Sequence, residues 1–263
     1  MMIEFRSATP ADLPRLRSLW RQAFADEDAF IEQFFETAFA PERSQVALLG
    51  DVVCSMLYWF PLICRGQPMA YLYGVATAHE AQHRGLCTAL LRHTHALLER
   101  AGAAGVLLVP GTKQLVSFYR RLDYRPCCPM APLVAARGSD PLLLKQVSPE
   151  EYGALRQTLL PSGGVEQGGV NLTFASRLSG LYAGEGLLLC AQKRPDGSIL
   201  GQELLCRDPE SAAPGVLAAL EADAGEFQIP GAQRPSSSRD FAMFLPLHAW
   251  RGPAPSYFGL AFD

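Results

Sequence analysis

The segment at residues 75–91, VATAHEAQHRGLCTALL, constrains the fold more than any other part of the chain. It begins as an apolar strand-like run, passes through a polar loop that ends at Gly85, and continues with leucines at helical spacing. A change of hydrophobic period around a glycine predicts a strand–loop–helix unit. The N-terminus of a helix presents unpaired N–H groups and a partial positive charge. The loop is therefore suited to an anion such as phosphate.

The side chains of this loop favour the same interpretation. Gly85 would allow a ligand to approach the backbone closely, because glycine has no side chain. Gln82 and Arg84 could add donors, and Thr88 would place a hydroxyl in the first turn. No Gly-Lys-Ser/Thr follows, so the loop is not a Walker motif, and its single glycine excludes a dinucleotide fingerprint.

The remaining pattern of the first half predicts the order β-α-α-β-β-β-α-β-α-β. Thr9, Pro10 and Asp12 form a helix start with cap, proline and acid in their usual places. The helix that follows Gly85 ends near Gly102. The other predicted elements are a strand at 3–6, a helix at 28–39, strands at 45–50, 52–63, 67–78 and 105–110, and a helix at 113–124 leading into a strand at Tyr124.

Composition excludes several classes of protein. The chain has 263 residues, 49% of them hydrophobic, and a net charge of −3, so it has no general attraction for nucleic acid or anionic membranes. No apolar run has the length of a membrane span, and the N-terminus does not resemble a signal peptide. The seven cysteines are scattered, and Cys127-Cys128 lacks zinc-ligand spacing. We expect a cytoplasmic protein without a metal.

The pattern restarts in the second half. A strand-like run precedes Ser148-Pro149-Glu150-Glu151, which repeats the cap, proline and acid of the first helix start. Strands at 186–193 and 198–206 flank a turn at 195–197, a helix covers 211–223, and a strand covers 225–231. We interpret this as a tandem repeat of one fold, with a linker within 125–141 and domains at 1–130 and 141–263.

The segment VATAHEAQHRGLCTALL resembles the acetyl-CoA signature of the GNAT N-acetyltransferases. The family pattern [Q/R]-x-x-G-x-[G/A] falls on Gln82, His83, Arg84, Gly85, Leu86 and Cys87, with Cys87 in place of a glycine or alanine. VSFYRRLDY resembles a later motif of the family, with Asp123 in place of glycine. The resemblance covers about the first half and implies the GNAT fold, an α/β (α+β) fold with a mixed sheet flanked by helices.

The resemblance also implies the site. Acetyl-CoA would be the cosubstrate, held by the end of the central strand and by the helix mouth, and a tyrosine would be the general acid. The residues that match the cofactor positions are Val75, Ala76, Thr77, Gln82, His83, Arg84, Gly85, Leu86, Cys87 and Thr88; the tyrosine is Tyr119. The alternative for Tyr119 is a core tyrosine with its hydroxyl at the surface.

The general base stays open. The central strand carries no acid, and His79, Glu80, His93 and His95 are expected on the surface. Tyr71, Tyr73, a group of the second half or the carboxylate of Asp263 are the alternatives. We expect specificity to come from residues 20–39, Tyr58, Trp59 and the second half.

The second half lacks the donor loop. Asp208 and Glu210 stand before its helix and would repel a pyrophosphate, so we expect a degenerate GNAT-like copy without a cofactor. A tandem arrangement with one active half resembles the enhanced-intracellular-survival class of acetyltransferases. Two functions remain: an N-acetyltransferase acting on a small-molecule or peptide amine, or a catalytically silent acyl-CoA sensor. A homo-oligomer is compatible with either.

Overall fold

A computed structural model describes residues 3–262. The N-terminal half follows the predicted order of elements. Its strands are β1 Ile3–Ser7, β2 Ser44–Leu49, β3 Val52–Cys64, β4 Gln67–Thr77, β5 Gly105–Leu108 and β6 Arg125–Ala136, and its helices are α1 Leu13–Ala23, α2 Asp28–Thr37, α3 Leu86–Arg100 and α4 Lys113–Arg120.

The second half adds elements of the same kinds. Its strands are β7 Lys145–Gln146, β8 Val165–Glu166, β9 Gly180–Gly184, β10 Leu187–Lys193, β11 Ile199–Cys206, β12 Ala224–Pro230 and β13 Arg239–Pro246, and its helices are α5 Pro149–Leu159, α6 Val170–Leu178 and α7 Pro209–Ala219. The sequence pattern did not predict β8, β9 or α6.

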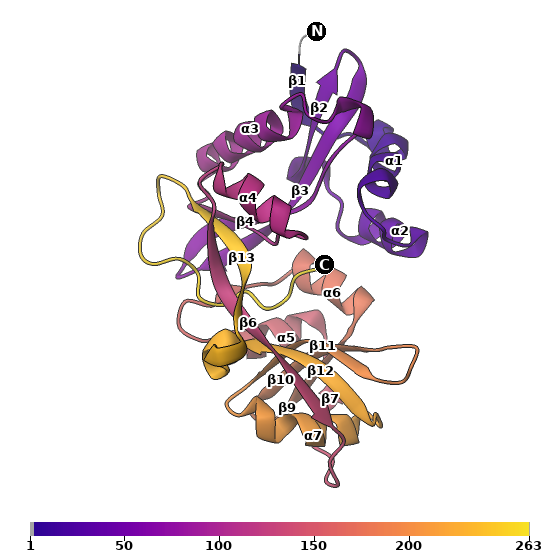
Figure 1. Ribbon diagram of the computed structural model, residues 1–263, viewed down its shortest axis with the longest axis vertical. Helices are drawn as coiled ribbons and strands as arrows, with labels where there is room; N and C mark the ends of the chain where they lie inside the picture. Colours follow the sequence, from indigo (N-terminus) through magenta and orange to yellow (C-terminus); the bar gives the residue numbers. More distant parts are fainter. Residues whose placement is uncertain (1–2, 263) are drawn as a thin grey trace.

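The strands of the described residues form one mixed sheet of thirteen strands. Its order is β1-β2-β3-β4-β5-β13-β6-β12-β11-β10-β9-β7, with β8 paired to β3. Two pairs are parallel, β4 with β5 and β11 with β12, and each is joined through a helix, α3 or α7. Figure 1 shows the result as two lobes connected by the long strands β6 and β13. This confirms the predicted mixed α/β fold.

Strand β13 returns from the end of the second half into the sheet of the first. It pairs antiparallel with β5, and its other edge pairs with residues 125–130 of β6. The remaining part of β6 pairs with β12, through Met130–Ala136. Most of the segment 125–141, where we expected a linker, is therefore strand, and the two halves share β6.

Local sequence explains where the main helices begin. The Asp12 carboxylate accepts a hydrogen bond from the Thr9 backbone N–H at 2.7 Å, so the predicted cap closes a short 3-10 turn before α1. The Ser148 hydroxyl accepts from Glu151 N at 3.1 Å and caps α5. Gly85 begins α3 with φ +77°, a conformation that favours glycine.

Helices cover both faces of the N-terminal part of the sheet. On one face, α1, α2 and α6 pack on β3 and β4 around the buried rings of Trp20, Phe34 and Phe174. On the other face, leucines of α3 pack against β2, β3 and β4. The first core also contains Phe258 and Phe262 from the C-terminal segment, so residues of both halves build it. The last described residues of the chain accordingly lie beside α6, between the lobes (Figure 1).

Candidate functional site

The site begins where β4 and β5 separate. Their parallel pairing ends at Tyr71 and Leu107, although β4 continues to Thr77. A bulge at Gly74 bends β4, since Tyr58 pairs with Tyr73 and Met56 with Ala76. Gly74 has φ +58°, and a Cβ there would lie 2.8 Å from Cδ2 of Tyr58. Only glycine fits this bulge, which leaves the end of β4 without a partner in β5.

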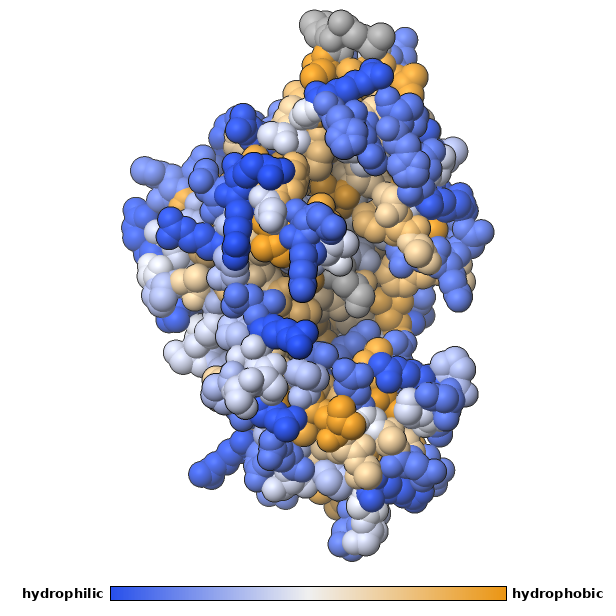
Figure 2. Space-filling view, in the orientation of Figure 1, coloured by the Kyte–Doolittle hydropathy of each residue, from blue (hydrophilic) through white to orange (hydrophobic). Residues whose placement is uncertain are grey.

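A cavity of about 540 Å³ occupies the gap between these strands. Its walls come from α1 and the residues after it, from β4 and β5, from α4 and from the C-terminal segment. Most of the lining is apolar or aromatic: Trp20, Phe24, Tyr71, Leu72, Tyr73, Val75, Leu108, Val109, Leu115, Tyr119 and Phe262. Figure 2 shows this face of the upper lobe hollowed between the α3–α4 side and the α1–α2 side, with apolar residues in the hollow.

The predicted anion loop leads from the end of β4 into α3. The Gln82 side-chain amide donates to the Thr77 carbonyl at 3.3 Å and so closes the loop on itself. His83 has φ +60°, and His83, Arg84 and Gly85 are all exposed. Ala89 N is the first donor to the helix ladder, to Gly85 O at 2.9 Å, so the preceding N–H groups point out of the helix mouth.

The first turn of α3 is partly buried. Leu86 lies in the core, Thr88 is half-buried, and burial raises the pKa of Cys87 to about 11. Cys87 is thus a neutral thiol that packs against the sheet. A Cβ at Gly85 would meet no atom within 4 Å, so the space before the helix is open. The helix mouth is thus open with Cys87 at this position.

Tyr119 lies on α4 and lines the cavity with its side chain 6% exposed. Its ring packs edge-on against Phe118 at 5.1 Å and Tyr124 at 5.6 Å between centroids. The neighbouring Arg120 and Arg121 are exposed, and Arg121 lies over the Phe118 ring at 5.9 Å. The structure thus brings Tyr119 to the same gap as the end of β4.

Two of the alternatives for the general base lie at the cavity. Tyr71 and Tyr73 line the cavity, and the Tyr73 hydroxyl donates to the Phe262 carbonyl at 3.0 Å. Asp263 lies outside the described residues. Glu80 is exposed and pairs with Arg15 at 3.1 Å, as expected of a surface residue.

The expectation that His93 and His95 lie on the surface was wrong. His93 is half-buried and stacks on Phe5 at 4.9 Å. His95 Nε2 lies 2.7 Å from the Tyr124 hydroxyl, and burial lowers the pKa of His95 to about 4. The reason is that α3 is covered on this side by β1 and by the turn after α4, which the helical period alone does not reveal.

Sequence reasoning did not single out Asp26, although it lies within the range 20–39 expected to give specificity, and it missed Phe262. Asp26 is the one acidic residue among the cavity-lining residues of the described chain, and its carboxylate accepts from Trp20 Nε1 at 2.7 Å. Phe262 reaches the cavity from the C-terminal segment, whose apolar run SYFGLAF was the available signal. Tyr58, proposed for specificity, is instead buried beneath Trp20 and Phe34, with its pKa raised by that burial.

The corresponding place in the second half is closed. Asp208 caps α7 by accepting from Ser211 N at 3.2 Å, and Glu210 pairs with Arg234 at 3.1 Å. The ring of Phe227 on β12 covers Gly201 on β11, so no Cβ would fit there. This half offers carboxylates and a packed ring where the first offers N–H groups and space.

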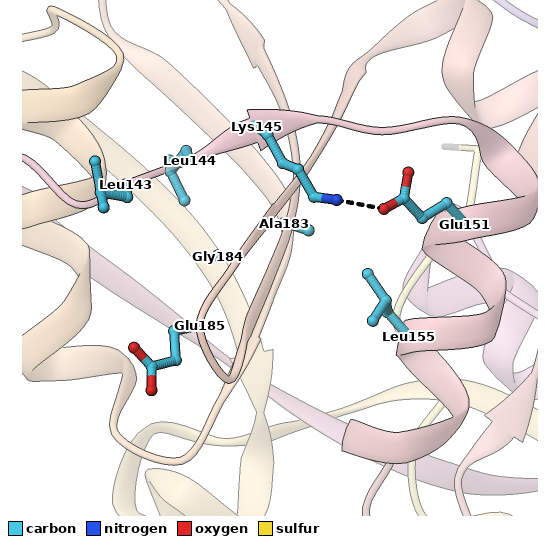
Figure 3. A pocket seen from close by; sticks show the side chains of 8 residues that line it. All are labelled: Leu143, Leu144, Lys145, Glu151, Leu155, Ala183, Gly184 and Glu185. Carbon is cyan, nitrogen blue, oxygen red and sulfur yellow. Dashed lines mark hydrogen bonds and ion pairs between the residues drawn. The ribbon is translucent and has the colours of Figure 1, made fainter.

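Another depression lies in the C-terminal lobe, beside β7, β9 and α5 (Figure 3). Leucine side chains and the ion pair of Lys145 with Glu151 line it. Its side chains belong to neither the split strands nor the helix mouth, so it is separate from the candidate site. Among the described residues, no helix is long and apolar enough to span a membrane, and no cluster of metal-binding side chains occurs.

Comparison with known proteins gives the family of the N-terminal half. Residues 4–127 match the family described as Acetyltransferase (GNAT) domain. The N-terminal half of the chain is therefore a GNAT acetyltransferase domain. No curated protein matches the chain significantly.

Solved structures are similar over nearly the whole chain. A GCN5-related N-acetyltransferase from Kribbella flavida has a TM-score of 0.74 at 16% identity, covering 94% of this chain and 72% of its own. One from Anabaena variabilis has 0.67 at 17%, covering 92% and 72%. Eis1 from Mycobacterium abscessus has 0.68 at 14%, covering 93% and 73%. At these identities the likeness shows the fold alone.

Proposed function

We propose that this protein transfers an acetyl group from acetyl-CoA to a primary amine of a small molecule or peptide. The observation that carries the proposal is the juxtaposition of an open helix mouth at Gly85, the split between β4 and β5, and Tyr119 at one cavity. The acetyltransferase family of residues 4–127 supports the reaction class.

The residues present fit acetyl-CoA. The pyrophosphate would lie on the N–H groups from Arg84 to Thr88, where the helix dipole and the positive φ of Gly85 favour an anion. The pantetheine would follow β4 along Val75–Thr77, whose backbone lies beyond the last pair with β5. The thioester would thus reach the aromatic cavity.

The chemistry requires little of the protein beyond position and one proton. The amine nitrogen would attack the thioester carbonyl, and the C–S bond would break as the departing thiolate takes the Tyr119 hydroxyl proton. The proton that the new amide nitrogen loses would pass through water to the Tyr119 oxygen, which restores the tyrosine. Backbone N–H groups at the end of β4 stabilise the oxyanion. Asp26 in the cavity lining would attract an ammonium acceptor, which must lose a proton before its nitrogen attacks.

We infer that only the first half binds the cofactor and that the second is a degenerate copy of the same fold. In both halves a parallel strand pair is joined by one helix, α3 or α7.

The seven cysteines are free thiols in the structure, which fits a reducing, cytoplasmic environment.

The test is acetyl transfer to a panel of aliphatic, aromatic and peptide amines. The release of the CoA thiol and the mass of the product are measured. Reactions without amine, and with Gly85→Glu, control for hydrolysis and for chemical acetylation. Release of free CoA together with an acetylated amine supports the proposal. Calorimetric binding of acetyl-CoA with no transfer to any amine would instead favour the silent sensor.

A further inference from the structure

The C-terminal lobe contains a fully buried ion pair beside the last residues of the described chain. Arg156 of α5 and Glu203 of β11 are 1% and 0% exposed, and their closest atoms are 2.9 Å apart. The hydroxyls of Tyr152 and Tyr257 each donate to the Glu203 carboxylate at 2.7 Å. Burial alone would lower the pKa of Arg156, but the Glu203 carboxylate raises it above its usual value.

The backbone of the C-terminal segment is held at three carbonyls, one of them by this pair. Arg156 Nη2 donates to the Phe258 carbonyl at 2.8 Å, and Gln167 Nε2 donates to the Leu260 carbonyl at 2.7 Å. Val165 N donates to the Tyr257 carbonyl at 2.8 Å. The residues 257–262 form no regular element, so these bonds replace the ladder that a strand would have.

Gly259 shows how closely the segment passes the pair. It has φ +79°, and a Cβ there would overlap Oε1 of Glu203 and lie 2.9 Å from Arg156 Nη2. A glycine is therefore required both by the backbone conformation and by the space. The segment and the pair are fitted to each other.

The same segment ends at the acceptor cavity. Phe258 packs edge-on against Tyr71 at 4.9 Å, and Phe262 packs against Tyr73 at 5.7 Å and Phe60 at 4.9 Å. Phe262 lines the cavity, and its carbonyl accepts from the Tyr73 hydroxyl at 3.0 Å. Contacts thus run continuously from the buried pair to the cavity wall.

We propose that Arg156 and Glu203 are positioning residues, which fix residues 257–262 so that Phe262 forms a wall of the acceptor cavity. The proposal rests on the proposed function for what the cavity binds. A buried ion pair adds little stability compared with apolar residues of the same volume, because both charges lose their hydration. Its use here is therefore to give the tail one donor of fixed direction, from Arg156 to the Phe258 carbonyl, and one acceptor, from Glu203 to the Tyr257 hydroxyl.

The first experiment needs no turnover. 4-Fluorophenylalanine is introduced at position 262 alone, and the H2O/D2O solvent isotope shift of its 19F resonance reports exposure of the ring. In the natural background the shift should be near zero, because Phe262 is 6% exposed. Arg156→Met with Glu203→Gln removes both charges together, so no charge is left buried alone. We expect this double variant to stay folded and to show a clear isotope shift.

A matched pair of conservative variants controls for stability. Tyr257→Phe and Tyr152→Phe each remove one hydroxyl bond of 2.7 Å to Glu203, but only Tyr257 belongs to the tail. Tyr257→Phe should expose the fluorine and Tyr152→Phe should not, at similar melting temperatures. An unchanged resonance in a folded double variant, or equal effects of the two tyrosine variants, would overturn the proposal. If the double variant does not fold, the tyrosine pair decides.

The second experiment measures acetylation of phenethylamine as a probe acceptor. Tyr257→Phe should raise KM for the amine by about fivefold while KM for acetyl-CoA stays within about twofold, since the pair lies away from the helix mouth. Tyr152→Phe should change neither. A fluorine change without any acetylation would contradict the proposed function and leave the positioning role intact, so the two failures are distinguishable.

Discussion

The molecule has two parallel strand pairs that are each joined through a helix. Each pair has three residues in register, but the side chains around the two pairs differ. In the first, Met69–Tyr71 pair with Gly105–Leu107; in the second, Ile199–Gly201 pair with Gly225–Phe227. The first pair, β4 and β5, opens into a cavity, and Gly85 precedes its helix α3. In the second, the ring of Phe227 lies over its strand partner Gly201, and the helix that follows is capped by Asp208. The comparison teaches that the crossover provides only a frame, and that its side chains decide between a binding site and a core.

The largest expected effect comes from placing an acidic side chain before α3, as Asp208 precedes α7. Gly85→Glu adds bulk and negative charge where the pyrophosphate would lie, so acetyl-CoA affinity should fall by at least about a hundredfold, or about 3 kcal/mol. Isothermal calorimetry measures this in folded protein. Gly169→Glu is a matched control, because Gly169 also precedes a helix with positive φ and open space. Equal acetyl-CoA affinity in the two variants would show that the cofactor does not bind at the N-terminus of α3.

The next effect concerns the tyrosines near the open crossover. Tyr119→Phe retains the ring and removes the hydroxyl that we propose as proton donor, so kcat should fall by about a hundredfold with acetyl-CoA affinity nearly unchanged. Tyr124→Phe makes the same change in the neighbouring buried ring, which bonds to His95 rather than lining the cavity. It should leave kcat within about threefold. If both variants keep full kcat, Tyr119 is a packing residue.

A smaller effect should appear in the pH dependence of stability. His95 is neutral when folded, with a pKa of about 4 against 6.5 in the unfolded chain, so the unfolded state binds more protons between these values. Stability from this group is complete above the unfolded pKa and is lost as pH falls towards 4, by about 2 kcal/mol at pH 5.

Urea unfolding at pH 7 and pH 5 measures this loss. His95→Gln keeps a partner for Tyr124 but does not titrate, so its stability should change less between the two pH values. His79→Gln, at an exposed position, should retain the full loss. A pH dependence that is the same in all three proteins would show that His95 does not cause it.

The smallest expected effect tests the closed crossover. Asp208→Asn with Glu210→Gln removes the charges that would repel a phosphate, yet the Phe227 ring still covers Gly201 and no glycine precedes the helix. Calorimetric titration should therefore still give one acetyl-CoA per chain. A second site in this variant would mean that charge alone had closed the second half.

Features encoded locally could be predicted from the sequence. The order of the first ten elements, the helix mouth at Gly85 and the caps at Thr9 and Ser148 follow from residue patterns over a few turns. The family resemblance placed Tyr119, and the structure locates its side chain at the cavity. The assignments of the cofactor residues and of the tandem repeat stay predictions.

Features that depend on distant pairings could not be predicted. Nothing in the residues of β13 says that it will pair with β5, since a strand pattern does not name its neighbour. From the sequence alone, Arg156 resembles an arginine on the surface of a helix. Arg17 is such a residue, since its ion pair with Glu32 is partly exposed to solvent. Its burial depends on Glu203, whose position on an apolar strand gave no sign of a partner. Phe262 was missed for the same reason.

The return of β13 also determines when the acetyltransferase domain can be completed during synthesis. A ribosome releases β1 to β6 long before Arg239–Pro246, so β5 has no antiparallel neighbour while the second half is being made. The nascent N-terminal half therefore presents an unsatisfied strand edge and an incomplete core until the last segment emerges. The N-terminal half is translated first, but β13 and residues 257–262 are needed to complete its sheet and its core.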